Sequence, residues 1–349
     1  MHRPRRTLRA AAALAVAAGL ALTTGCAPQA GKAEAAPTTP APPPPPPPTV
    51  PWPLTGVETT DPVQRPALAV KIENSPESRP QAGLNGADMV WEEVVEGGIT
   101  RFVAVYHSTL PPEIGPIRSV RPMDAAIAAP LHGLFAFSGG QQPFVQAVAG
   151  AGMQVVSHDK GHGGFYRHPD RYAPHNVYAD PADFLAQADP QHTADPIEQF
   201  SMASAADQPS ALGTGTPAAV LKLKLSGMST PTWAWDGAQQ AWLRSEGSAP
   251  AMQADGQQLK ATNVVVLRVD IVNTRYTDPA GNPVPETAMV GSGEALVATG
   301  GHTLAARWSK ASETDRVVLT DAHGTPVMLA AGNTWVELVP NRSGSVTVG

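Results

Sequence analysis

The stretch that decides the fold is ADMVWEEVVEGGITRFVAVYH, at residues 87–107. Its first part, residues 87–94, alternates apolar and polar side chains, as a β-strand does. Its last part, residues 101–107, is almost continuously apolar and predicts a largely buried strand. Gly97 and Gly98 lie between the two parts. The stretch therefore predicts two strands of a buried sheet.

Strand and helix patterns alternate on both sides of this stretch. Residues 68–72 and 134–138 are short apolar runs typical of strands, and residues 122–134 and 143–149 have helical spacing. Interleaved strands and helices predict an α/β domain with a mixed sheet, which we place at residues 54–205.

The C-terminal part of the chain carries short strand patterns separated by turns such as Asp236-Gly237. These patterns lie at residues 219–225, 232–235, 241–245, 264–271, 295–298, 304–308, 316–319, 327–330 and 334–338. They predict a mostly-β domain, a sandwich or open barrel, at residues 215–349. The small, polar residues of 201–217 predict the domain boundary. The predicted fold class is therefore α+β, with an α/β N-terminal domain and a mostly-β C-terminal domain.

Residues 1–25 have the features of a secretory signal peptide: a basic start, an apolar run too short to cross a bilayer, and a small residue before Cys26. Cys26, the single cysteine, resembles the lipidated cysteine of a bacterial lipobox, although Thr23 stands where that motif usually has leucine. The resemblance implies a lipid anchor in the membrane and an extracytoplasmic location. An ordinary signal peptide is the alternative.

Residues 26–53 contain an unbroken run of prolines at 42–48. Such a run favours a polyproline II rod, so we expect a semi-rigid stalk behind the anchor. A polyproline ligand for a partner domain is the alternative reading.

The formal net charge is −6, and it becomes about −10 without the signal peptide, which holds four arginines and no acid. This balance argues against nucleic acid or an anionic lipid surface as the main partner. With Cys26 alone, no structural disulfide is expected. No cofactor motif is present, so we expect no cofactor.

Several motifs resemble the family of YerB-like lipoproteins, whose two domains are named DUF3048. The motifs are KIEN at residues 71–74, RPQAGL at 79–84, EGGITRF at 96–102, GPIRSVRP at 115–122, APHN at 173–176, ATNVVV at 261–266, GSGEA at 291–295 and GNTWVE at 332–337. The resemblance implies a lipoprotein with two domains and covers nearly all of the chain after the stalk. It implies no particular reaction.

Arg101, Arg118 and Arg121 form the strongest candidate site. Guanidinium groups are the preferred partners of phosphate and carboxylate, so three of them around one turn predict an anion site. His175 and Asn176, behind a proline, are expected on a loop that faces these arginines. The alternative is structural, with the arginines paired to acidic residues nearby in the sequence, namely Glu92, Glu93 and Glu96.

Other candidate motifs are weaker. His158 and His162 have the spacing of metal ligands on a helix, but the surrounding glycines indicate a loop, and we expect no metal there. Ser138-Gly139-Gly140 lacks the nucleophile-elbow and phosphate-loop patterns and indicates a strand–helix turn. The tryptophans of the C-terminal part are read as core residues, with a sugar platform as the alternative.

Two functions follow from these observations. The first is a membrane-anchored binding protein for an anionic cell-envelope ligand or partner. The alternative is an enzyme, because residues 87–155 faintly resemble the LytR–CpsA–Psr phosphotransferases. In that reading Arg118 and Arg121 hold a pyrophosphate, and an acidic metal ligand falls near Asp88. The family's Arg-Asp pair is absent, since Ser119 follows Arg118.

Overall fold

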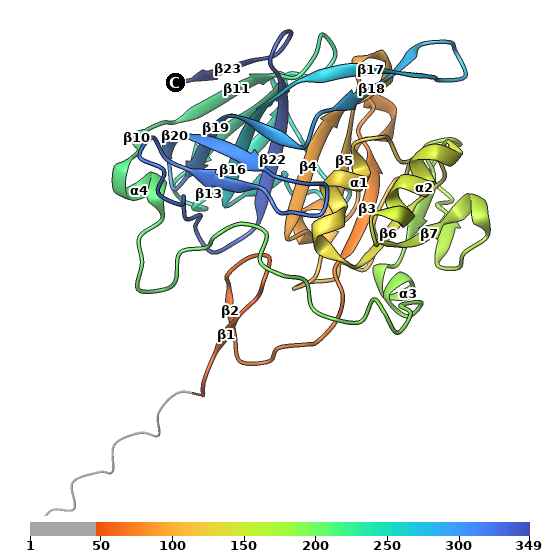
Figure 1. The fold of residues 1–349 in the computed structure, drawn as a ribbon, viewed down its shortest axis with the longest axis horizontal. Coiled ribbons are helices and arrows are strands. Elements are labelled where there is room, and N and C mark those ends of the chain that lie inside the picture. Colours follow the sequence, from red (N-terminus) through yellow and green to blue (C-terminus); the bar gives the residue numbers. More distant parts are fainter. Residues whose placement is uncertain (1–46) are drawn as a thin grey trace, which may run out of the picture. The chain divides into compact units, whose positions relative to one another are not determined.

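An eleven-stranded mixed sheet runs through residues 47–349, the part of the chain that this computed structural model describes (Figure 1). Residues 1–46 lie outside the described part, and with them the predicted signal peptide, Cys26 and most of the predicted stalk. The strands of the sheet are, in order across it, β10 (Thr216–Pro217), β20 (His302–Lys310), β19 (Gly291–Thr299), β16 (Asn263–Val269), β22 (Thr334–Pro340), β4 (Met89–Val94), β5 (Thr100–Tyr106), β3 (Leu68–Glu73), β6 (Leu134–Phe137) and β7 (Gln154–Ser157). Strand β21 (Val318–Thr320) pairs with β20.

Two groups of three parallel strands in this sheet point in one direction. Strands β16, β22 and β4 are parallel neighbours, as are β3, β6 and β7. Strand β5 is antiparallel to both β4 and β3, so these two groups also point the same way. The carboxyl ends of all six strands therefore lie at one edge of the sheet, which we call the carboxyl edge.

Smaller elements surround the central sheet. A second, antiparallel sheet contains β14 (Ala249–Pro250), β13 (Ala241–Glu246), β12 (Pro231–Asp236), β11 (Val220–Lys224), β23 (Ser345–Val348) and β15 (Lys260–Ala261). Three two-stranded pairs are β1 (Val50–Pro51) with β2 (Glu58–Thr59), β8 (Phe165–Arg167) with β9 (Val177–Ala179), and β17 (Ile271–Thr277) with β18 (Pro283–Thr287). The helices are α1 (Asp124–Ala128), α2 (Gln142–Gly150), α3 (Pro181–Leu185) and α4 (Ser210–Thr214), and short 3-10 turns lie at Pro76–Ser78, Leu84–Gly86, Glu96–Gly98, Ala129–Leu131 and His158–Lys160.

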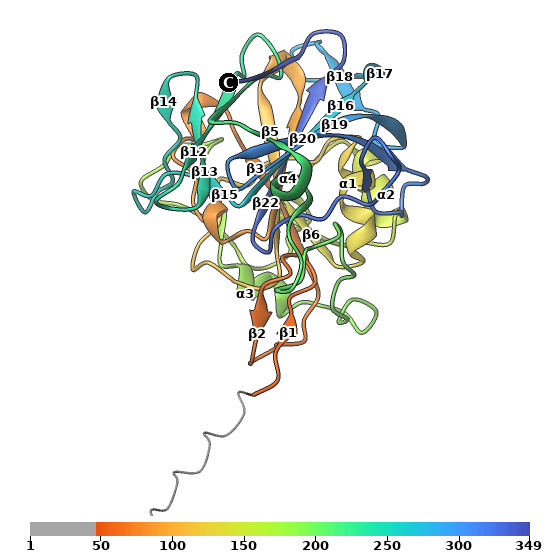
Figure 2. The same cartoon turned by 90° about the vertical axis from the view of Figure 1, so that its left-hand side faces the viewer.

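Alternate side chains of the central strands enter two hydrophobic cores, because successive residues of a strand point to opposite faces. On the helix face, Trp91 and Val103 join the core beneath α1 and α2. On the sheet face, Val90 and Phe102 pack in one core with Trp233 of the second sheet. Figure 2 shows α1 and α2 on one side of the central strands and β12–β14 on the other. Burial on both faces explains the continuous apolar runs of β3 and β5.

The predicted fold class is confirmed: a mixed sheet with helices forms the N-terminal part, and the C-terminal part is mostly β. Strands β3, β4, β5 and β6 lie within two residues of their predicted positions. Two local predictions differ. Residues 327–330 are not a strand, since Leu329 only bridges to Met202. The predicted helix at residues 122–134 is reduced to α1 and a 3-10 turn, which a left-handed His132 ends.

Candidate anion-binding site

The segment of residues 116–121 carries two of the predicted arginines, Arg118 and Arg121, across the carboxyl edge. Strands β3 and β6 pair only as far as Val70 and Ala136, and this segment then enters between them. The backbone NH of Arg118 donates to the Lys71 carbonyl at 2.8 Å, and the Ser138 NH donates to the Arg118 carbonyl at 3.0 Å. Arg118 and Arg121 are thus held where the strand ends diverge, the usual place for ligand sites in open α/β sheets.

Arg101 brings a third guanidinium to the same place. It lies near the start of β5, opposite Glu73 of β3 and Glu93 of β4. Its Nη1 donates to the Ser119 carbonyl at 2.6 Å, between Arg118 and Arg121 in the sequence. The structure therefore brings together the three predicted arginines, which we call the arginine site.

Two carboxylates neutralise part of this charge. Arg118 Nε lies 3.2 Å from a Glu73 oxygen, and Arg121 Nε lies 2.7 Å from a Glu96 oxygen. Arg101 has no carboxylate within ion-pair distance among the described residues, and its Nε has no hydrogen-bond partner there. Burial, and then the positive charges of Arg121 and Arg118, lower the pKa of Arg101 to about 9. The site thus retains uncompensated positive charge.

His175 joins the arginine site, as predicted, and Asn176 supports it from behind. His175 Nδ1 lies 2.9 Å from Glu73 Oε2, and Arg118 Nη1 donates to the Pro174 carbonyl at 3.3 Å. Asn176 is buried, and its Oδ1 accepts a hydrogen bond from Arg167 Nη1 at 2.7 Å. Asn176 therefore fixes the loop rather than facing the arginines.

The adjacent Glu92 and Glu93 point to opposite faces of the sheet. Glu93 lies on the helix face, where Lys71 Nζ donates to it and also, at 2.7 Å, to Asp124 Oδ1. Asp124 Oδ2 in turn accepts the backbone NH of Arg121 at 2.6 Å. Burial and the charge of Asp124 raise the pKa of Glu93 to about 8, although Lys71 opposes the shift. This fully buried triad supports the backbone of the arginine site.

Glu92 takes part in a second buried cluster on the sheet face. Arg244 of β13 lies 2.8 Å from Glu92 and 2.9 Å from Glu337 of β22, and all three side chains are fully buried. Burial opposes the charge of Arg244, but Glu246, Glu92 and Glu337 raise its pKa above the usual value. Burial and the nearby Glu92 charge raise the pKa of Glu337 well above its usual value. Glu92 is therefore a structural ion-pair partner, and its partner is Arg244 rather than one of the predicted arginines.

Asp88 lies apart from the arginine site. Asp88 precedes β4, whereas Glu93 lies near the carboxyl end of that strand. The length of β4 therefore separates Asp88 from the arginine site. Asp88 accepts hydrogen bonds from the backbone NH groups of His107 and Ser108, at 2.5 and 2.8 Å, and from the Ser108 hydroxyl. Burial raises its pKa. The structure does not bring Asp88 together with Arg118 and Arg121.

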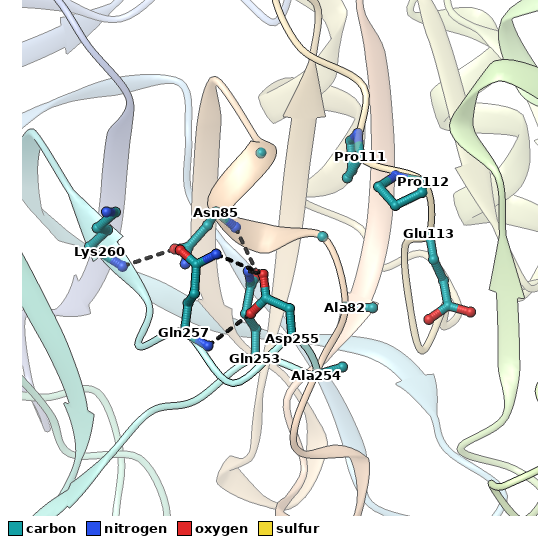
Figure 3. A pocket seen from close by; sticks show the side chains of 12 residues that line it. Ala82, Asn85, Pro111, Pro112, Glu113, Gln253, Ala254, Asp255, Gln257 and Lys260 are labelled. Atoms are coloured by element: carbon teal, nitrogen blue, oxygen red, sulfur yellow. Dashed lines mark hydrogen bonds between the residues drawn. The ribbon is translucent and has the colours of Figure 1, made fainter.

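A pocket of about 510 Å³ lies between residues 82–86, 111–113 and 253–260, and none of the predicted site residues lines it (Figure 3). Several of its polar side chains form hydrogen bonds with neighbouring protein groups. Asn85 Oδ1 accepts the Lys260 NH at 3.0 Å, and Gln253 Nε2 donates to Asp255 at 2.6 Å. The Asn85–Lys260 bond joins the N-terminal part of the chain to the C-terminal part.

The remaining candidate motifs have structural places. Ser138-Gly139-Gly140 forms the turn between β6 and α2, and a Cβ at Gly139 would lie 1.7 Å from an Asp159 oxygen. Trp233, Trp242 and Trp335 are fully buried in the core of the sheet face. Within residues 47–349, no group of three or more His, Cys, Asp or Glu side chains has the arrangement of a metal site. None of the helices there is long and apolar enough to cross a membrane.

Sequence reasoning missed several charged residues, among them Glu73, Lys71, Asp124, Arg244 and Glu337. Lys71 had a visible signal, because a lysine within the apolar run LAVKI requires a buried partner. Arg244 and Glu337 had none, since the two residues are 93 positions apart and meet only in the folded chain.

Comparison with known proteins places these features in a family. Residues 54–194 match the domain described as "Protein of unknown function (DUF3048) N-terminal domain", and residues 221–336 match the corresponding C-terminal domain. The chain belongs to the DUF3048 family. The resemblance to YerB-like proteins that the motifs indicated is thus confirmed.

One curated relative is "Putative lipoprotein YerB" of Bacillus subtilis (strain 168), 34% identical over 140 residues. That alignment covers 39% of this chain and 41% of the relative, so the chain spans about two fifths of the relative's length. The crystal structure of the YerB protein from Bacillus subtilis is similar in fold, with a TM-score of 0.71 and 22% identity. This similarity covers 85% of this chain and 99% of the YerB chain.

Proposed function

We propose that this DUF3048 protein is a membrane-anchored lipoprotein that binds an anionic ligand of the cell envelope at the arginine site. The observation that carries the proposal is Arg101, a nearly buried guanidinium surrounded by two others and without a carboxylate of its own among the described residues. An anion at this place would relieve the repulsion between the three guanidiniums. It would also accept hydrogen bonds from their free N–H groups.

The location at the membrane rests on the sequence and on the relative's name. The signal-like residues 1–25, the position of Cys26 and the proline run behind it fit a lipidated protein on a stalk. A relative that is described as a lipoprotein supports the same assignment. The anchor would place the arginine site on the outer side of the membrane, where envelope polymers and their precursors carry phosphate and carboxylate groups.

Binding is favoured over phosphotransfer because of the position of Asp88. A transferase of the kind considered above needs an acidic metal ligand beside the arginines, and Asp88 is bonded to a loop at the other end of β4. The carboxylates near the arginines are themselves engaged, Glu73 with Arg118 and His175, and Glu96 with Arg121.

Thermal unfolding of the full chain in detergent, with and without pyrophosphate, tests the proposal. A ligand at 100 times its Kd stabilises the folded state by about 2.7 kcal/mol. We expect Arg118→Ala to remove this stabilisation. Arg307→Ala, at an exposed arginine on β20, is the matched control and should retain it. Absence of a shift at millimolar pyrophosphate, or an equal shift in Arg118→Ala, would refute the arginine site as an anion site.

A further inference from the structure

The loop of residues 158–176 lies beside the arginine site and is fixed to it by several hydrogen bonds. His175 contacts Glu73 at 2.9 Å, and the Pro174 carbonyl accepts from Arg118 at 3.3 Å. The Arg171 guanidinium donates to the carbonyls of Arg79, at 3.2 Å, and of Pro80. The end of this loop therefore has a defined position relative to the guanidinium groups.

Tyr172 belongs to this fixed loop and is 89% exposed, the highest value among the large hydrophobic side chains of residues 47–349. Its carbonyl accepts the His175 NH at 2.9 Å, so the backbone on both sides of it is ordered. Among the described residues, none hydrogen-bonds to its hydroxyl or stacks on its ring. An exposed aromatic ring on an ordered loop is a typical contact surface for a ligand. Ordering the loop costs conformational entropy, and contact with a ligand would offset that cost.

Two guanidiniums are available to an anion here: that of Arg171, adjacent to Tyr172 in the sequence, and that of Arg118, which contacts the Pro174 carbonyl. Arg171 forms no ion pair within residues 47–349 and bonds only to neutral carbonyls. Arg118 is one quarter exposed, and its single carboxylate contact, Glu73, is shared with His175. This part of the surface therefore combines the positive charge of Arg118 and Arg171 with the uncovered aromatic ring of Tyr172.

This combination selects a particular ligand chemistry. Guanidinium groups bind phosphate through charge-assisted hydrogen bonds. The negative face of an aromatic ring attracts polarised C–H groups, such as those on the apolar side of a sugar ring. A ligand that satisfies both carries a phosphate directly on a sugar.

We propose that the arginine site and Tyr172 together bind a sugar phosphate, with the phosphate at Arg118 and the sugar ring on the face of Tyr172. This inference rests on the proposed function and specifies its ligand class. Tyr172 supplies preference for the sugar, and the arginines supply the affinity for the anion.

Isothermal titration of the full chain in detergent with three probes tests the inference: inorganic phosphate, N-acetylglucosamine 1-phosphate and N-acetylglucosamine. We expect the sugar phosphate to bind roughly three- to tenfold more tightly than inorganic phosphate. Tyr172→Ala should abolish this preference and leave the affinity for inorganic phosphate unchanged. Tyr172→Phe keeps the ring and should keep the preference. Because Tyr172 is exposed, neither substitution affects folding.

The outcomes distinguish this inference from the proposed function. Equal affinity of the unmodified chain for phosphate and sugar phosphate would overturn the sugar contact and leave the anion site in place. An equal loss of both affinities in Tyr172→Ala, or binding of the neutral sugar that survives Arg118→Ala, would also overturn it. Absence of binding of both phosphates would overturn the inference and the proposed function together.

Discussion

Replacement of Arg244 by methionine should destabilise the protein strongly. The guanidinium is fully buried and lies 2.8 Å from Glu92, 2.8 Å from Glu246 and 2.9 Å from Glu337. Loss of one partner from a buried ion pair costs about 3–5 kcal/mol, because the remaining charge stays buried without compensation. Methionine fills much of the volume, so the cavity contribution remains small.

The aromatic surroundings of Arg244 add to the loss. Its guanidinium carbon lies 5.2 Å from the Trp335 ring centre and 5.5 Å from those of Phe102 and Trp233. A desolvated cation–π contact contributes up to about 2 kcal/mol. We therefore expect Arg244→Met to lower the free energy of unfolding by at least about 3–5 kcal/mol.

Urea unfolding of the full chain, followed by tryptophan fluorescence, measures this effect. A triple variant with Glu92→Gln and Glu337→Gln added should recover at least half of the loss, because it removes the buried charges that Arg244→Met leaves unpaired. Arg307→Met, at an exposed position of β20, is the control and should stay within about 0.5 kcal/mol of the original chain. A loss below about 1 kcal/mol in Arg244→Met, or no recovery in the triple variant, would refute the reasoning.

Three further substitutions test other parts of the structure. Glu93→Gln should flatten the pH dependence of stability: the raised pKa, about 8, means that the folded chain holds an extra proton, so stability falls as pH rises from about 4.5 towards 8. Parallel stability–pH curves for the variant and the original chain in urea unfolding would contradict this. Asp88→Ala should cost about 1–3 kcal/mol in the same assay, because two backbone NH groups lose their acceptor, and should leave pyrophosphate binding unchanged. Gly83→Ala should lower the melting temperature, since φ is +85° and the new Cβ would lie 2.6 Å from the Glu113 carbonyl oxygen; an unchanged melting temperature would count against the local geometry.

Local patterns in the sequence were sufficient for the individual strands and for part of the candidate site. The alternation and apolar run in residues 87–107 predicted β4 and β5, since the side-chain period of a strand is a local property. The proximity of Arg118, Arg121 and Arg101 was also predicted, and Arg121 does pair with Glu96, as the structural alternative required.

The pairing of strands that are distant in the sequence could not be predicted from local patterns. Strand β22 pairs in parallel with β4 although Trp335 and its partner Val90 are 245 positions apart, and no local period encodes such a contact. The partners of Glu92 and Glu93 were wrong for a more avoidable reason. Successive residues of a strand face opposite sides, so these two carboxylates could not both reach the same arginines.

The opposite directions of Glu92 and Glu93 connect the N-terminal and C-terminal regions of this chain into one structure. Glu93 lies on the helix face and, through Lys71 and Asp124, reaches the backbone that carries the arginine site. Glu92 lies on the sheet face and is held by Arg244, a residue of the C-terminal region. A chain without that region would leave Glu92 without a counter-charge and β4 without its neighbour β22. The strand that supports the arginine site therefore depends on the C-terminal region for its own stability, although every residue of the site belongs to the N-terminal one.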